Sequence, residues 1–107
     1  MDNISTNIKT VLERLNGAYA PNTLKSYYAD ARAFVDWCGE RNIEPFPIAS
    51  ETLCAYIECL QVNSAYSTIR RRIASLRRLN RMLGFEDQTR TEEVYLAIRR
   101  LKRSKCL

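Results

Sequence analysis

Histidine is absent from this 107-residue chain, and glycine and proline are scarce, with three residues of each. Histidine is the side chain best suited to exchange protons near neutral pH, so its absence disfavours most enzymes that use general acid–base catalysis. With few chain breakers and 46% hydrophobic residues, the sequence fits one globular domain over residues 1–107 and not a disordered chain.

Long apolar runs are also missing. No stretch approaches the roughly 20 apolar residues that a membrane-spanning helix needs. The first residues, MDNISTNIKTVLERL, lack the basic and then apolar layout of a signal peptide. We therefore expect a cytoplasmic protein with no membrane partner.

The four cysteines form no C-x-x-C pair, and without histidine they make a poor zinc site. We expect reduced thiols and no metal or other cofactor, with Cys38 acting as a small hydrophobic residue on an apolar helical stripe. The other three cysteines are Cys54, Cys59 and Cys106.

The net charge of +5 is unevenly distributed. Residues 1–65 hold five Lys or Arg and eight Asp or Glu, whereas residues 66–107 hold twelve and four. This asymmetry indicates a polyanionic partner that meets mainly the C-terminal part, with nucleic acid favoured over a membrane surface.

Apolar residues recur at helical spacing throughout, and no convincing strand pattern is found, so the fold class predicted is all-α. Short connections favour a compact bundle of about five helices. We expect Ser50 to cap the third, Ser67 or Thr68 the fourth and Thr91 the fifth. The predicted helices span about 5–18, 21–41, 50–61, 67–84 and 91–105, with an extended connector at 43–49.

The first and second helices each have a clear apolar stripe, the third places Leu53, Tyr56, Ile57 and Leu60 on one side, and the connector has apolar residues that can tuck under the fold. Trp37 lies outside the stripe of the second helix, and we expect it to form a second packing surface and not to stack on bases. The stripe residues are Ile4, Ile8, Val11, Leu12 and Leu15 in the first helix and Leu24, Tyr28, Ala31, Val35 and Cys38 in the second; those of the connector are Ile43, Phe46 and Ile48.

The stretch STIRRRIASLRRLNRM, residues 67–82, contains six arginines and no acidic residue. On a helical wheel its apolar side chains share one stripe, most arginines occupy the opposite half, and Arg72 lies at the edge of the core. The stripe holds Ile69, Ile73, Leu76 and Leu83, with Leu79 beside it; the opposite half holds Arg70, Arg71, Arg77, Arg78 and Arg81.

A solvated charged face is the alternative interpretation of this helix. Exposed helices, however, usually intersperse Glu among their cations, and six like charges repel one another unless an anionic partner is bound. Ser67, Arg71, Ala74 and Arg78 share one line, so small residues let the helix axis approach phosphates or guanine edges. The face carries no aromatic side chain for unpaired bases, which favours duplex DNA.

The start of the second helix offers Thr23, Lys25 and Ser26, which suit phosphate contacts at a helix N-terminus. The alternative is that Asn22 or Thr23 only caps the helix and that Lys25 is solvated.

The order and spacing of these segments resemble the N-terminal core-binding domain of tyrosine recombinases, the phage integrase family that includes Cre-like enzymes. The resemblance covers residues 20–105. It rests on T-x-x-x-Y before a helix ending FVDWC, on PIASETLCAYIECL, and on S-T-I-x-x-x-x-x-x-L-x-x-L-x-R ending in Leu-Gly.

The resemblance implies a SAM-like helical domain that clamps one face of duplex DNA with its second and fourth helices in the major groove. A separate catalytic domain closes on the other face. It also implies that the first and fifth helices contact other protomers in the DNA synapse, with Tyr95 or Leu96 outside the core. The DNA-binding residues carried over are Thr23, Lys25, Ser26, Ser67, Thr68, Arg70, Arg71 and Arg72; the charge pattern adds Arg77, Arg78 and Arg81.

The family's catalytic domain needs an arginine pair, a lysine, histidine or tryptophan partners and a tyrosine nucleophile. We expect this chain to hold none of that machinery and not to be an enzyme by itself. Residues 1–19 would form the N-terminal helix, and residues 99–107 would begin a linker to the absent catalytic domain.

The function predicted is to grip recombination-site DNA for integration or recombination, in a bacterial or phage protein associated with the nucleoid. Two alternatives remain open. One is a stand-alone helical DNA-binding regulator, and the other is a SAM-like protein-interaction module with an acidic partner.

Overall fold

The computed structural model describes the backbone of residues 3–105 and the side chains of residues 8–105. It contains α-helices and no strand within that described range, so the all-α fold class is confirmed. None of these helices is long and apolar enough to cross a membrane. The helices are α1 (Asn3–Arg14), α2 (Pro21–Glu40), α3 (Ser50–Leu60), α4 (Tyr66–Met82) and α5 (Glu92–Lys105).

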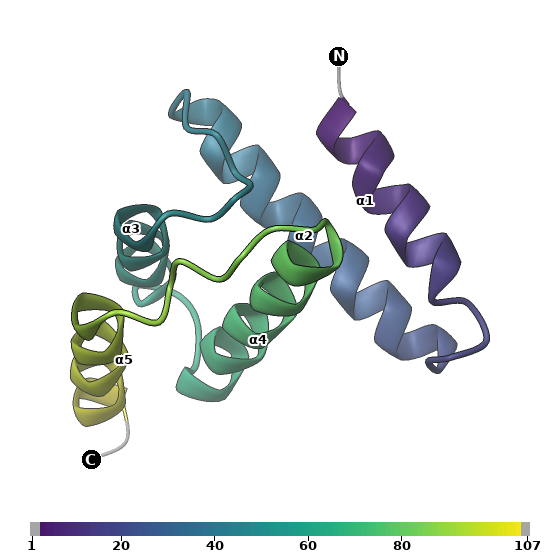
Figure 1. Cartoon of the computed structure of the whole chain (residues 1–107). Helices are drawn as coiled ribbons and strands as arrows, with labels where there is room; N and C mark the ends of the chain where they lie inside the picture. The colour runs from purple at the N-terminus through teal and green to yellow at the C-terminus, as the bar shows by residue number, and fades with distance from the viewer. Residues whose placement is uncertain (1–2, 106–107) are drawn as a thin grey trace.

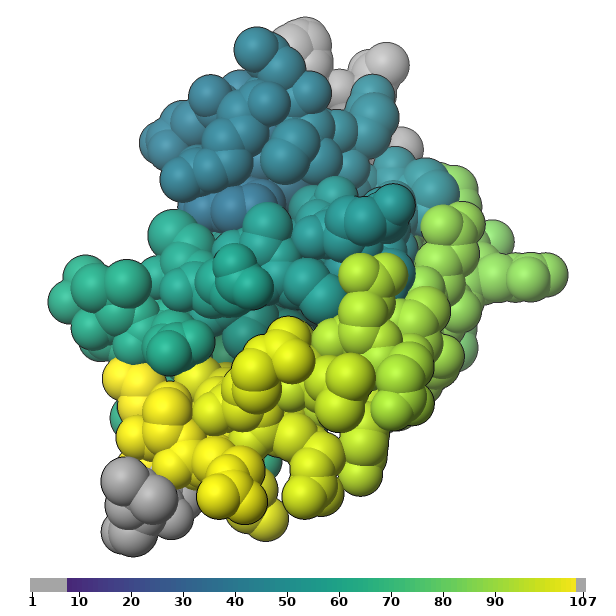
Figure 2. All heavy atoms as spheres, turned by 90° about the vertical axis from the view of Figure 1, so that its left-hand side faces the viewer, coloured from purple at the N-terminus to yellow at the C-terminus, as the bar shows by residue number. Residues whose placement is uncertain are grey.

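The long helix α2 runs through the middle of the arrangement (Figure 1). Helix α1 packs along one side of it, and α4 packs across another. Helices α3 and α5 pack against each other and form one outer wall of the molecule (Figure 2). α4 therefore contacts both α2 and α5.

Aromatic rings make the centre of the core. Phe34 is fully buried, and its ring centroid lies 5.0 Å from that of Tyr56 and 5.8 Å from that of Phe46. Trp37 lies 5.1 Å from Tyr56, and the Arg41 guanidinium covers its ring at 4.3 Å. Trp37 is thus a packing residue, as expected, but it packs in the central aromatic cluster and not on a second surface.

The buried face of α2 differs from the one expected. Tyr28 is 44% exposed, and Leu24 and Val35 are only partly buried, whereas Ala31 and Cys38 are fully buried. The stripe is centred on Phe34 instead, because this ring enters the aromatic cluster. The spacing of apolar residues did not predict this centre, because Asp30, which is buried one turn before Phe34, is charged.

Several expected helix ends were also wrong by a few residues. α1 ends at Arg14 and not at Ala18, and the turn that follows contains Gly17 at φ +90°, a conformation that favours glycine. α4 begins at Tyr66, so neither Ser67 nor Thr68 caps it. Ile4 of the expected apolar stripe lies outside the described side chains, whereas Ile8, Val11 and Leu12 are buried and Leu15 is partly buried.

Ser50 is the first residue of α3 and does not cap it, because the N-cap position is Ala49. The Ser50 hydroxyl is instead hydrogen-bonded to Thr91 Oγ1 at 2.5 Å. Thr91 does cap α5, since its Oγ1 accepts a hydrogen bond from the Val94 N–H at 3.4 Å. A hydroxyl near the start of a helix can form its hydrogen bond with a residue of another segment and not with its own helix. The spacing of residues in the sequence does not show which of the two occurs.

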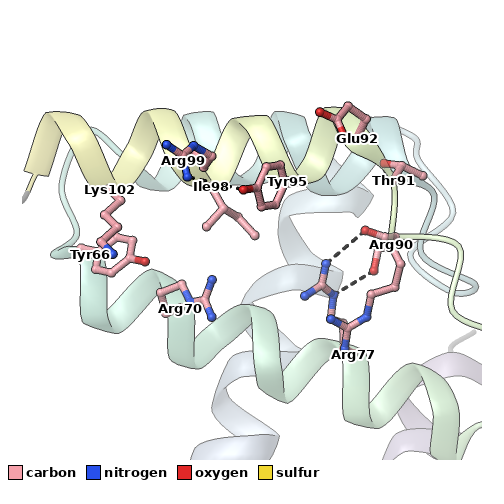
Figure 3. Close-up of a pocket in the computed structure, with 11 residues that line it drawn as sticks. Tyr66, Arg70, Arg77, Arg90, Thr91, Glu92, Tyr95, Ile98, Arg99 and Lys102 are labelled. Atoms are coloured by element: carbon pink, nitrogen blue, oxygen red, sulfur yellow. Dashed lines mark hydrogen bonds between the residues drawn. The ribbon is translucent and has the colours of Figure 1, made fainter.

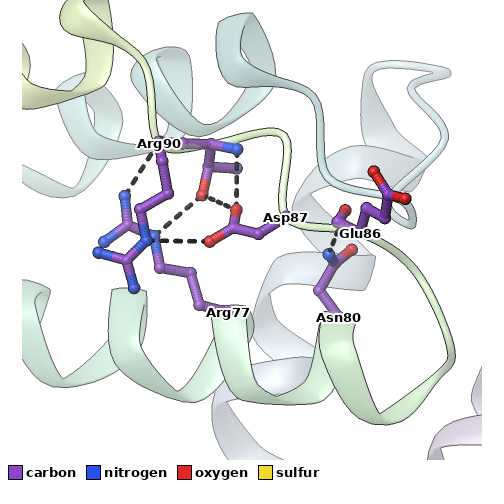
Figure 4. Close-up of polar contacts among 6 residues, drawn as sticks. Arg77, Asn80, Glu86, Asp87 and Arg90 are labelled. Atoms are coloured by element: carbon purple, nitrogen blue, oxygen red, sulfur yellow. Dashed lines mark hydrogen bonds and ion pairs between the residues drawn. The ribbon is translucent and has the colours of Figure 1, made fainter.

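The connector between α2 and α3 lies under the fold as expected, with Phe46 and Ile48 buried and Ile43 partly buried. Asn80 of α4, which is 1% exposed, accepts a hydrogen bond from the Ile48 N–H at 3.0 Å. Its amide donates another to the Glu86 carbonyl at 3.2 Å (Figure 4). One side chain thus joins the connector to the loop after α4.

A buried carboxylate joins α2 to α4. Asp30 is 3% exposed and accepts hydrogen bonds from Arg71 Nη1 and, at 2.8 Å, from Ser75 Oγ. Arg72 Nε lies 4.0 Å from its other oxygen. A charge removed from water is tolerated when it is paired and hydrogen-bonded, so this cluster sets how α4 lies against α2.

Replacing Asp30 with alanine should destabilise the domain strongly. The change leaves the buried Ser75 hydroxyl and the Arg71 guanidinium without their acceptor and removes the charge that faces Arg72, which we expect to lower the free energy of unfolding by roughly 2–4 kcal/mol. Urea denaturation followed by circular dichroism measures this. The matched control is Asp36→Ala, on the same helix but in an exposed pair with Arg32. Equal shifts of the midpoint in both variants would contradict the assignment.

The described cysteines are free thiols in different surroundings, and Cys106 lies outside the described residues. Burial raises the pKa of Cys38 to about 11, although Arg41 opposes the shift, whereas Cys59 is exposed. No group of side chains in the described part of the chain is arranged to hold a metal ion.

Iodoacetamide should therefore modify Cys59 in the native protein and leave Cys38 intact. The reagent needs an accessible thiolate, and Cys38 is fully buried with almost no thiolate at mildly alkaline pH. Peptide mapping by mass spectrometry before and after addition of denaturant measures the difference. Rapid labelling of Cys38 in the native state would show that the core around α2 opens easily.

Candidate nucleic-acid interface

Helix α4 separates an apolar side from a basic side, as predicted. Ile69, Ile73, Leu76 and Leu79 are buried at 0–3% exposure, and Leu83 is partly buried. Of the arginines, Arg70, Arg71 and Arg81 are exposed, whereas Arg72, Arg77 and Arg78 are half-buried. Arg72 lies at the edge of the core, where the helical wheel put it.

Four of these arginines make hydrogen bonds or ion pairs with other residues of the chain. Arg71 and Arg72 meet Asp30, and Arg72 Nη1 also lies 3.4 Å from the Tyr56 hydroxyl. Arg78 donates to the Tyr19 hydroxyl at 3.1 Å, and its guanidinium lies 5.9 Å from the centre of that ring. These guanidinium groups are held in place before any ligand arrives.

Arg77 is held by the loop between α4 and α5 (Figure 4). Its Nε donates to the Thr89 hydroxyl at 2.9 Å and its Nη2 to the Thr89 carbonyl at 3.0 Å. Burial lowers the pKa of Arg77, and the nearby cation Arg90 lowers it further. Arg77 therefore holds the loop onto α4 and is less free than an exposed arginine.

Asp87 organises the same loop. Its carboxylate accepts hydrogen bonds from the Thr89 N–H at 2.8 Å and hydroxyl at 2.5 Å, and from Arg90 Nε at 3.1 Å. Partial burial alone would raise the pKa of Asp87, but these hydrogen bonds outweigh burial and lower it. The Asp87-x-Thr89 spacing, typical of a side-chain turn, was the signal in the sequence that could have revealed this loop.

Arg70 and Arg81 differ from the other four arginines. Neither guanidinium makes a hydrogen bond or ion pair with any residue between 8 and 105 that the structure describes. The two residues lie 11 positions apart on one helix, a rise of about 16 Å at 1.5 Å per residue. Their full set of donors is therefore available to a ligand.

A basic hollow of about 490 Å³ lies beside α4, where Tyr27 of α2 borders it. Arginines supply most of its lining, no acidic side chain lines it, and Ala74 exposes the helix backbone between them. A polyanion can approach α4 closely at this point. The arginines around the hollow are Arg70, Arg71, Arg77, Arg78, Arg81 and Arg90.

The remaining predicted residues lie at two helix starts and do not line the hollow. On α2, Lys25 and Ser26 are exposed and Thr23 is half-buried; on α4, Ser67 is exposed and Thr68 half-buried. The N-cap of α2 is Ala20, so capping by Asn22 or Thr23 does not explain those side chains.

A second hollow, of about 630 Å³, separates α4 from α5 (Figure 3). Its cations Arg90, Arg99 and Lys102 were not predicted, because they lie outside the arginine run of α4. The i,i+3 spacing of Arg99 and Lys102 was a signal that both share one face of α5.

Comparison with known proteins gives two matches. The model of the family described as "Phage integrase, N-terminal SAM-like domain" matches residues 12–86. An "Integrase/recombinase xerD homolog" from Selenomonas ruminantium is 33% identical over 72 residues, which are 67% of this chain and 21% of that protein. The match thus spans about a fifth of the length of this relative.

The family match begins in α1, includes the whole of α2, α3 and α4, and ends in the loop after α4. It therefore contains Asp30, the arginine run and Asn80, the residues that hold the basic helix in place. The five-helix fold and the family model agree, and this chain belongs to the family of phage integrase N-terminal SAM-like domains.

Proposed function

We propose that this chain is the core-binding domain of a site-specific tyrosine recombinase, and that it grips duplex recombination-site DNA through α2 and α4. The observation that carries the proposal is the outer side of α4, where arginines surround a hollow that no acidic side chain lines. Breaking and rejoining of DNA would be performed by a catalytic domain elsewhere in the protein.

The dimensions of α4 support binding in a major groove. This groove is about 12 Å wide and admits one α-helix, whose outer side chains then reach base edges and phosphates. Arg70 and Arg81 mark the two ends of the basic side, and Ala74 lies between them, where a large side chain would keep the helix axis away from DNA. Helix α4 can therefore lie deep in the groove.

The arginines that the protein already holds contribute in another way. A guanidinium group has five N–H donors, and Arg78 uses one of them in its hydrogen bond to the Tyr19 hydroxyl. Because its position is set by the fold, less side-chain entropy is lost when a phosphate binds. Arg71, Arg77 and Arg78 thus offer a preorganised positive surface, while Thr23, Lys25 and Ser26 add phosphate ligands from α2, and Ser67 and Thr68 from the start of α4.

The same proposal covers the rest of the chain. Residues 1–107 would act as one domain that does not cut DNA by itself, with residues 99–107 leading toward the catalytic domain. Contacts with other protomers would use α1 and α5, where Tyr95 is 54% and Leu96 39% exposed. The domain would work on DNA in the cytoplasm.

Removing the two unengaged arginines should weaken DNA binding. For Arg70→Gln/Arg81→Gln we expect lower affinity for a random-sequence duplex, and a salt dependence shallower by roughly one unit for each phosphate that the variant no longer neutralises. Fluorescence anisotropy at several salt concentrations measures both quantities. Lys9→Gln/Arg14→Gln is the charge-matched control, because both residues are exposed on α1 and line neither hollow.

If both double variants give identical titrations, the basic side of α4 does not bind DNA and is a solvated charged surface. No binding of the wild-type chain even at low salt would favour a protein-interaction module with an acidic partner. If the free domain instead dimerises and prefers a palindromic site, a stand-alone regulator explains it better.

A further inference from the structure

The hollow between α4 and α5 is strongly basic. Of the cations that line it, only those on α4 are among the predicted DNA-binding residues. Arginines and a lysine come from both helices and from the loop that closes one end, and Glu92 is the one acidic residue in its lining (Figure 3). The cations are Arg70, Arg77, Arg90, Arg99 and Lys102.

Little of this positive charge is neutralised within the part of the chain that the structure describes. Arg90 pairs with Asp87, but Arg77 binds only neutral groups of Thr89. Arg99 contacts the Tyr95 hydroxyl at 3.4 Å and lies 5.8 Å from that ring, again without a carboxylate. The Lys102 ammonium makes no hydrogen bond or ion pair with a described residue. The hollow therefore presents several uncompensated cations to solvent.

The position of the hollow indicates what it can bind. Arg70, Arg77 and Arg90 line both this hollow and the one beside α2, so α4 forms a ridge between two basic depressions. A helix that enters a major groove has one sugar–phosphate backbone on each side. A helix in that position would thus place one strand over each hollow.

We propose that the α4–α5 hollow receives the backbone of one DNA strand while α4 occupies the adjoining major groove, with Arg99 and Lys102 contacting phosphates. This inference rests on the proposed function, and it adds α5 to the DNA-binding surface. Tyr66 and Ile98 supply an apolar floor against which deoxyribose can pack.

Helix α1 of a second copy, which the protomer contact proposed above would bring to α5, is a poorer fit to this hollow. The exposed charged side chains described on α1 are Lys9, Glu13 and Arg14, whose net charge of +1 does not match the cations. A phosphate backbone has one negative charge per nucleotide and matches all of them.

The test is a salt titration of duplex binding with variants of α5. Arg99→Gln/Lys102→Gln should lower the affinity for unrelated sequences alike, and should make the slope of log affinity against log salt shallower by roughly two units. Arg100→Gln/Arg103→Gln is the control, because it removes the same charge from the same helix at exposed positions that do not line the hollow. Arg81→Gln, which lines only the other hollow, reports on α4 independently.

The outcomes separate this inference from the proposed function. If Arg81→Gln weakens binding while Arg99→Gln/Lys102→Gln matches its control, α4 lies on DNA and the α5 contact is wrong. Tighter binding of a single strand than of a duplex, abolished in the α5 variant, would overturn the backbone contact in favour of unpaired bases stacking on Tyr66 and Tyr95. If the wild-type chain binds no DNA, both proposals fail.

Discussion

The arrangement of α2 and α4 depends on one buried carboxylate. Asp30 is almost wholly removed from water, and its charge is stabilised because Arg71 and Ser75 of α4 donate hydrogen bonds to it and Arg72 places a second positive charge nearby. A buried charge of this kind tolerates few alternatives, since sliding or rotating α4 by part of a turn would leave it unpaired. The apolar contacts around it are less directional and would accept several packings.

That constraint divides the arginine run into two roles. Arg71 and Arg72 satisfy Asp30, and Arg77 and Arg78 bind Thr89 and Tyr19, so four of the six arginines hold other elements to α4. Arg71, Arg77 and Arg78 also line the basic hollow beside α2, and each has more N–H donors than these contacts use. The basic surface and the internal bracing are thus made by the same side chains, and a substitution in the run affects folding and binding together.

Much of the fold could be predicted from the sequence because helices and their apolar stripes leave a local period. The α4 stripe is the clearest example: all of its predicted core residues are buried or partly buried. The α2 stripe was less accurate, since Tyr28 was expected inside and Phe34 was not expected at its centre. Periodicity ranks apolar side chains but does not show which of them meet a ring from another helix.

The parts of the site that sequence could not reveal involve contacts across long separations. Asp30 and Arg71 are 41 residues apart, and the hydroxyls of Ser50 and Thr91 are equally distant. Nothing local distinguishes a buried aspartate from a solvated one. The cations of α5 were missed for a related reason. They share a hollow with the arginines of α4 only because the loop that contains Asp87 turns the chain back, and this depends on tertiary structure.

The charge of α4 also couples folding to binding. Six arginines on one helix repel one another in the free domain, and Asp30 is the one carboxylate that pairs with any of them within the described chain. A ligand that binds only the folded state stabilises it, and the stabilisation grows with the logarithm of the ratio of ligand concentration to dissociation constant. A polyanion would both relieve the repulsion and add this linkage. The run is therefore least costly to the fold when the domain is bound, which is the state in which a DNA-gripping domain would do its work.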